Sequence, residues 1–419
     1  MAVFSMLELQ YSMLRIGPKN RKGVKLTHMS IRKTVCVIVG LFVFSTTAFG
    51  HWTRPSLPTP GKDAMVATVG SVDCHFTSIR EAAAIVPSGS ILRLSNETFT
   101  EGGIVLDKDL FIIGAGSGET IVQASESLET ASERVFLVEA SVTAVIQDIT
   151  MRHGHPMGDC PRGGGAIVNY GTLWLDRCIV SDNIGQCGGA LLNRDGIVSA
   201  FDCMFIRNES DGGRDMTGVQ GMGSGGGIKN TKGEMLLDGC TIADNVARKK
   251  GGAVKNCCLA TLRMINCTVS GNACKSGGLH LNGPALIDHC TVVFNTAPFS
   301  LGAGIFVNSQ SVIRNTIVFG NTMGDVTVEM EEDGALAEFS NVWIGDGRTS
   351  IGAFDGDPRL GPLGENGGLT WTHLLLSGSE AIDAAFSNGE SPLVDQRGFL
   401  RTVGSAPDLG AVEVNANER

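Results

Sequence analysis

The stretch Gly251-Gly252-Ala253-Val254-Lys255-Asn256 decides the fold, because close variants of it recur through the middle of the chain. Each copy runs through small residues and a short apolar stretch into an asparagine. These asparagines are Asn169, Asn193, Asn230, Asn256, Asn282 and Asn308, at intervals of 24, 37, 26, 26 and 26 residues. A period of this length is typical of a stacked repeat rather than of a globular domain.

A second landmark, a cysteine followed five positions later by an asparagine, repeats in step with the first. Its copies are Cys178/Asn183, Cys203/Asn208, Cys240/Asn245, Cys267/Asn272 and Cys290/Asn295. Both series contain one long interval of 37 residues between their second and third copies. Because two independent markers agree, we interpret residues 209–224 as a loop inserted into one repeat.

The apolar residues of each repeat alternate along the chain and come in runs of only three to five residues, as at 173–175 and 178–180. This pattern predicts short strands and excludes helical repeats. Three short strands in 24 to 26 residues, joined by Gly, Asn and Asp turns, indicate one coil of a parallel β-helix. The fold class is therefore all-β: a single-stranded right-handed parallel β-helix with N-terminal and C-terminal caps.

Apolar runs before the repeats predict that the β-helix begins earlier. Its expected early strands are Ile91–Leu94, Gly103–Leu106, Leu110–Ile113, Thr120–Val122, Val135–Val138 and Val145–Met151. We therefore divide the chain into a linker and N-terminal cap at 51–90, a β-helix at 91–351 and a C-terminal cap at 352–419.

The first 50 residues have the layout of a secretory signal peptide. A ten-residue apolar run, Val35–Phe44, follows Arg32 and Lys33 and leads into small residues ending at Gly50. Met29 is an alternative start. No later segment has 18 uninterrupted apolar residues, so no transmembrane segment is expected in the mature chain. The predicted location is secreted or in the cell envelope, on the outer surface.

Charge and composition exclude other classes of protein. With a net charge of −10, the chain lacks the excess of Lys and Arg that nucleic-acid binding requires. Glycine accounts for 56 of the 419 residues without a collagen period, and 42% of the residues are hydrophobic, which is enough for a large core.

Stacking of equivalent positions predicts which side chains face inward. We assign one row to the interior of the β-helix, namely Ile167, Leu191, Ile228, Val254, His280 and Phe306, together with the asparagines that end each copy. Both asparagine series are interpreted as structural ladders of stacked amides. The five ladder cysteines are interpreted as buried thiols, because side chains that project in parallel from neighbouring coils suit disulfide geometry badly. They are Cys178, Cys203, Cys240, Cys267 and Cys290. Cys160 and Cys187 flank one coil and are a candidate disulfide.

Several motifs near the two ends resemble known families. Residues 77–82, Thr-Ser-Ile-Arg-Glu-Ala, resemble the CSLREA-type N-terminal segment of exported β-helix proteins. The tail is similar to the choice-of-anchor Q domain through Asn366-Gly367-Gly368, Thr372-His373, Ala381-Ile382-Asp383-Ala384, Asp395-Gln396-Arg397-Gly398 and Asp408-Leu409-Gly410-Ala411-Val412-Glu413. The repeats also resemble those of polymorphic outer-membrane proteins and of the pectate-lyase-like superfamily. These resemblances imply surface display or secretion. We further expect an Asp395–Arg397 salt bridge within the cap.

The charged residues that stack on the outside give a candidate catalytic patch. Asp182, Arg207 and Asp244 precede the ladder asparagine in three successive coils. A lyase would use a base and cations there, whereas cross-strand charge pairing on a solvated face is the simpler interpretation. No motif has metal-ligand spacing, so no cofactor is expected; calcium binding stays open, although no motif indicates it.

Three functions remain open at this point, the third being a passive structural module that awaits a partner anchor. The favoured one is an exported β-helix scaffold, an adhesion or matrix-type protein of the cell surface or secretome, whose partner is a polysaccharide or a cell-envelope component. The alternative is a carbohydrate-active enzyme, a polysaccharide lyase or glycoside hydrolase, that acts on the lateral face of the β-helix. The sequence does not indicate an oligomeric state.

Overall fold

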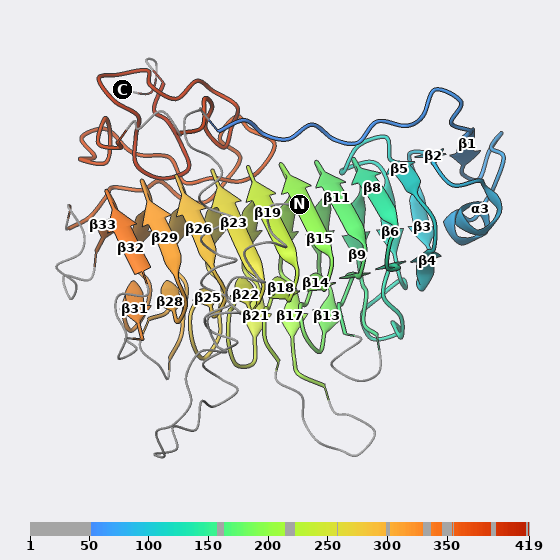
Figure 1. Ribbon diagram of the computed structural model, residues 1–419, viewed down its shortest axis with the longest axis horizontal. Coiled ribbons are helices and arrows are strands. Elements are labelled where there is room, and N and C mark those ends of the chain that lie inside the picture. The colour runs from blue at the N-terminus through green and yellow to red at the C-terminus, as the bar shows by residue number, and fades with distance from the viewer. Residues whose placement is uncertain are drawn as a thin grey trace, which may run out of the picture.

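The chain is a right-handed parallel β-helix (Figure 1). The computed structural model describes residues 52–156, 163–213, 223–257, 259–298, 302–329, 337–345, 354, 356–386, 391–415 and 418. The predicted signal peptide at 1–50, Cys160 and residues 214–222 of the inserted loop lie outside these ranges. None of the described helices is long and apolar enough to cross a membrane.

Three long parallel sheets run along the rod, and every strand pairs with its equivalent in the next coil. Sheet A consists of β1 (Val66–Val69), β2 (Ser90–Leu94), β5 (Leu110–Ile113), β8 (Thr143–Gln147), β11 (Thr172–Asp176), β15 (Ile197–Phe201), β19 (Glu234–Asp238), β23 (Thr261–Ile265), β26 (Ala285–Asp288), β29 (Ser311–Arg314) and β32 (Ala337–Ser340). The stack thus includes one strand, β1, before the first strand predicted from the sequence.

Sheet B follows sheet A in each coil, and sheet C closes the coil. Sheet B consists of β3 (Thr98–Thr100), β6 (Ile121–Gln123), β9 (Thr150–Arg152), β12 (Ile179–Ser181), β16 (Met204–Ile206), β20 (Thr241–Ala243), β24 (Thr268–Ser270), β27 (Thr291–Val293), β30 (Ile317–Phe319) and β33 (Trp343–Ile344). Sheet C consists of β4 (Ile104–Leu106), β7 (Phe136–Val138), β10 (Ile167–Asn169), β14 (Leu191–Arg194), β18 (Ile228–Thr231), β22 (Val254–Asn256), β25 (Leu279–Leu281), β28 (Ile305–Val307) and β31 (Val326–Val328). A short fourth sheet consists of β13 (Ile184–Gly185), β17 (Glu209–Ser210) and β21 (Val246–Ala247).

The two ends of the rod are covered differently. Helix α3 (Ile79–Ile85) lies at the N-terminal end, where Ser78 caps it and Ile79 is fully buried (Figure 1). The C-terminal segment, defined here as residues 356–386 and 391–415, lies beside the last coils rather than continuing the stack. Residues 52–65 run along the rod from the side of that segment toward β1 (Figure 1). Arg54 anchors them through hydrogen bonds to Asp202 and Asp238.

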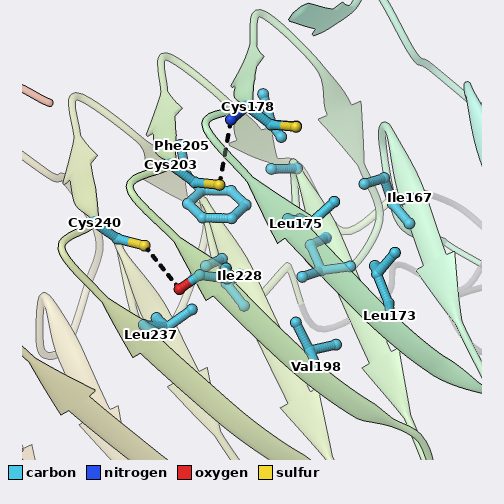
Figure 2. Packing of buried hydrophobic residues seen from close by; sticks show 14 of the residues in the cluster. Ile167, Leu173, Leu175, Cys178, Val198, Cys203, Phe205, Ile228, Leu237 and Cys240 are labelled. Carbon is cyan, nitrogen blue, oxygen red and sulfur yellow. Dashed lines mark hydrogen bonds between the residues drawn. The ribbon is translucent and has the colours of Figure 1, made fainter. Parts of the chain in front are cut away.

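A continuous apolar core fills the rod. Figure 2 shows Leu173 and Leu175 of sheet A facing Phe205 of sheet B across the interior. Cys178, Cys203, Cys240, Cys267 and Cys290 stack in the same core as buried free thiols. Burial raises the pKa of the Cys203 and Cys267 thiols, which keeps them protonated.

A row of buried amides runs along one corner of the rod. Each side chain in Asn183, Asn208, Asn245, Asn272 and Asn295 donates from Nδ2 to the Oδ1 atom of the residue in the next coil, over 2.9 to 3.0 Å. The last acceptors are Asn321 Oδ1 and then Asp325 Oδ1. The same amides also satisfy backbone groups that the turn would otherwise bury unpaired: Asn183 Nδ2 donates to Ser181 O, and Asn208 Oδ1 accepts from the Asn183 N–H.

The second amide row, in sheet C, is shorter than predicted. Asn169, Asn193, Asn230 and Asn256 pair in register, but Leu281 and Val307 occupy the next two positions. The prediction that Asn282 and Asn308 belong to this ladder is therefore wrong.

The same shift moves His280 and Phe306 to the outer face, so their predicted inward placement is wrong too. Val254 pairs with Leu279, and Leu279 pairs with Ile305. If the glycine pair set the register, the strand would be shifted by one residue and Leu279 and Leu281 would face outward. The alternation of apolar residues therefore decides the register of this strand.

His280 is nevertheless fully buried, stacked on Phe306 with ring centroids 4.4 Å apart. Burial, with the charges of Lys255 and Lys250, lowers the pKa of His280 from 6.5 to about 3. Because the pKa of His280 is lower in the folded chain, the unfolded chain binds the proton more strongly. Stability is therefore lost as the pH falls from 6.5 toward about 3.

We predict that His280 alone contributes a loss of about 2 kcal/mol in the free energy of unfolding between pH 6.5 and pH 5. The variant His280→Phe keeps the ring stack and removes the titration. Urea unfolding at both pH values is expected to show a smaller loss for the variant. Parallel losses in the two proteins would contradict the prediction.

Candidate functional site

A cavity of about 600 Å³ lies between the sheet B side of the rod and the C-terminal segment. It is lined by Asp244, Ser270, Phe294, Pro362, Leu363, Gly364, Glu365, Trp371 and His373. The first three residues belong to the β-helix and the others to the C-terminal segment. The site therefore requires both parts of the chain.

The β-helix side is built from the ends of neighbouring sheet B strands. Asp244 follows β20 and Phe294 follows β27, and both adopt positive φ angles, of 55° and 57°. Ser270 is the last residue of β24 and precedes Gly271, which has a φ of 70°. Asp244, Gly271 and Phe294 occupy equivalent positions in three successive coils, and their left-handed turns direct the Asp244 and Phe294 side chains away from the core.

The opposite side is a hairpin of the C-terminal segment. Leu360 pairs with Leu375, and Gly364 pairs with Thr372, in antiparallel bridges. The Asn366 side chain donates to the carbonyl of Thr372 over 2.8 Å and closes the loop. Trp371 and His373 project from the returning strand into the cavity lining.

Three threonines hold the C-terminal segment on the rod. Thr241 Oγ1 donates to the carbonyl of Trp371 over 2.5 Å, and Thr268 Oγ1 donates to Gln396 over 2.6 Å. Thr291 Oγ1 accepts from the backbone N–H of Ala411 over 3.0 Å. All three side chains are buried at the first position of a sheet B strand.

The sequence carries a signal for this docking that the spacing of the repeats alone does not reveal. The residue after the ladder cysteine is Ile179 or Met204 in the first two copies, and threonine in the next three. A change from an apolar residue to threonine at one outward position, repeated over three coils, marks a face that is covered by polar backbone.

The cavity combines aromatic surface with carboxylates. Phe294 is 42% exposed, and Trp371 packs at the edge of a small cluster that includes Met204 and Ala243. Asp244 and Glu365 are exposed at the rim. Burial raises the pKa of Asp244, and the positive charge of Arg207 opposes that effect.

The three sequence candidates do not form one site. Arg207 binds Asp182 through two hydrogen bonds, Nε to Oδ1 and Nη2 to Oδ2, each 2.8 Å long. Burial opposes the ionisation of Asp182, but this pairing prevails and lowers its pKa. Asp244 instead lines the cavity. The first two candidates are therefore an ion pair on a partly exposed face, which corresponds to the charge-pairing interpretation.

Within the described parts of the chain, no three His, Cys, Asp or Glu side chains converge in a way that would hold a metal ion. Cys187 is disulfide-bonded. Every other described cysteine is a free thiol, so the partner of Cys187 is not among the described residues. The predicted partner, Cys160, lies outside them.

Among known proteins, the chain is similar to several solved structures. No protein-family model and no curated protein sequence matches the chain. The pectate lyase Pel9A is 14% identical, with 84% of this chain and 97% of that chain covered and a TM-score of 0.48. A rhamnogalacturonan lyase is 11% identical, with 75% and 96% covered and a TM-score of 0.39. The pectin methylesterase from Aspergillus niger is 16% identical, with 73% and 92% covered and a TM-score of 0.34. At these identities and TM-scores the likeness says nothing of the activity of this chain.

Proposed function

We propose that this protein is an exported β-helix scaffold that binds an uncharged polysaccharide in the cavity between sheet B and the C-terminal segment. The observation that carries the proposal is the set of groups in that cavity. Phe294 and Trp371 offer apolar ring faces, while Asp244 and Glu365 offer carboxylate oxygens. Sugar rings pack their C–H faces on aromatic rings, and their hydroxyls donate to carboxylates.

The charge of the cavity selects among polysaccharides. Two carboxylates line it, and the nearby guanidinium of Arg207 is paired with Asp182. A polyuronate would meet the negative charge of these two carboxylates there, whereas a neutral glycan carries no charge for them to repel. The same pairing disfavours a lyase at Asp182, Arg207 and Asp244, because Arg207 already makes two hydrogen bonds to Asp182.

Export is part of this proposal. The apolar run before Gly50 supports a cleaved leader, and the disulfide at Cys187 is the kind of bond that persists in oxidising compartments. The tail motifs at 357–413 support a protein of the choice-of-anchor Q type at the cell surface or in the surrounding matrix.

The test compares two variants in titrations of neutral and acidic polysaccharides. Trp371→Ala removes the ring and is expected to weaken binding of a neutral glycan at least about fivefold, since aromatic contacts contribute about 1 kcal/mol beyond area burial. Arg207→Ala is the matched control, on the same face but outside the cavity lining, and is expected to change affinity less than twofold.

Equal affinity in the wild-type protein and in Trp371→Ala would refute the site. Binding of acidic polysaccharides alone would refute the proposed ligand class.

A further inference from the structure

Ser270 and His373 form a hydrogen-bonded pair in the lining of the cavity. The distance from Ser270 Oγ to His373 Nε2 is 2.9 Å, although the two residues are 103 positions apart in the chain. Each residue is only 4% exposed, yet both line the open cavity. The pair therefore lies beneath the rim formed by Asp244 and Glu365.

A second hydrogen bond fixes the tautomer of the histidine. His373 Nδ1 lies 2.7 Å from the carbonyl oxygen of Gly361. A carbonyl oxygen only accepts, so Nδ1 carries the proton, and Nε2 presents its lone pair to the hydroxyl of Ser270. Burial lowers the pKa of His373, with the Gly361 bond opposing, so the ring is neutral near pH 7. An oriented neutral imidazole that accepts from a serine hydroxyl is the arrangement of a nucleophile and its base.

We propose that Ser270 and His373 are a catalytic nucleophile and base that hydrolyse a small uncharged acyl ester, such as an acetyl group on a sugar hydroxyl. This inference rests on the proposed function for its natural substrate, because the acylated sugar would be the bound glycan. The two carboxylates of the rim disfavour an anionic acyl group.

Each step balances. Ser270 Oγ bonds to the acyl carbon while its proton passes to His373 Nε2, and the carbon–oxygen bond to the sugar breaks as that proton moves to the leaving hydroxyl. A water molecule then gives a proton to Nε2, its oxygen attacks the acyl carbon, and the bond to Oγ breaks. The carboxylic acid leaves and Oγ regains the proton.

Ser181 provides a matched control within the same sheet. It occupies the position of Ser270 three strands earlier, through the register Ser181, Ile206, Ala243 and Ser270. It is also 4% exposed, and its side chain lowers the pKa of the adjacent Asp182. Ser181→Ala therefore removes an equally buried hydroxyl from the same strand position without touching the pair.

The experiment measures hydrolysis of p-nitrophenyl acetate by the full chain and its modification by phenylmethylsulfonyl fluoride. We expect Ser270→Ala to lower the hydrolysis rate at least about a hundredfold, and Ser181→Ala to leave it unchanged. The sulfonyl group should map to the peptide that contains Ser270 in the unmutated protein, a result that does not depend on any variant folding. His373→Gln should lower both reactions.

Hydrolysis no faster than in buffer, a rate retained in Ser270→Ala, or a sulfonyl group on another residue would overturn the proposal. Binding of an unacylated neutral glycan separates this outcome from the proposed function. If Ser270→Ala and the wild-type protein bind that glycan equally while neither hydrolyses the ester, the binding site stands and the catalytic pair does not.

Discussion

Replacing Asn245 by alanine is expected to lower the free energy of unfolding by about 3 kcal/mol. Asn245 Oδ1 accepts from the backbone N–H and from Nδ2 of Asn208 over 2.9 and 3.0 Å. Its own Nδ2 donates to Phe205 O over 2.8 Å and to Asn272 Oδ1 over 2.9 Å. Alanine removes the acceptor of the buried Asn208 N–H, and an unsatisfied buried group of this kind costs about 1 to 3 kcal/mol. Asn208 Nδ2 keeps its bonds to Val180 O and Ile206 O, and Asn272 Oδ1 keeps the bond from the Asn245 N–H.

Asn308 supplies the control, because it lies outside both amide ladders and is half-buried. Asn308→Ala is expected to cost less than about 1 kcal/mol. Equilibrium unfolding in urea measures both variants. Equal losses would mean that the ladder contributes no more than an ordinary polar side chain.

Replacing Arg397 by methionine is expected to cost about 3 to 5 kcal/mol. The Arg397 side chain is fully buried in the C-terminal segment and bonds Asp395 over 3.1 Å, which is the predicted salt bridge. It also donates to the carbonyl of Asn366 over 3.2 Å and to Glu418 over 2.9 Å. Methionine preserves the apolar volume but leaves the Asp395 carboxylate buried without its counter-charge.

The exposed Arg359 of the same segment is the matched control, and Arg359→Met is expected to cost less than about 1 kcal/mol. A second replacement, Asp395→Asn in the Arg397→Met protein, is expected to recover part of the loss. Thermal unfolding of the single and double variants measures both effects. A loss below 1 kcal/mol for Arg397→Met would show that the ion pair does not hold the segment together.

The repeat landmarks predicted the fold because stacking converts a sequence period directly into a spatial neighbour. The Asn183 row illustrates this, since its fixed spacing from a ladder cysteine holds in the structure over all five copies. The shift at Asn282 could not be foreseen from glycine positions alone. There the alternation of Leu279 and Leu281 sets the register.

The cavity was less predictable for a different reason. Asp182 and Arg207 pair because they occupy adjacent coils, so the period reveals their contact. Ser270 and His373 belong to a periodic strand and a non-periodic segment, and only the docking of that segment on Thr241, Thr268 and Thr291 brings them together. No spacing in the sequence encodes that contact.

The central claim is that the cavity beside sheet B is where this protein binds its glycan. Hydrogen–deuterium exchange of the full chain, with and without a saturating neutral polysaccharide, tests it most directly. The account predicts protection at 241–245, 268–271 and 360–375, with sheet C unchanged. Protection confined to sheet C or to the helix end of the rod, or no protection from any neutral polysaccharide, would contradict it.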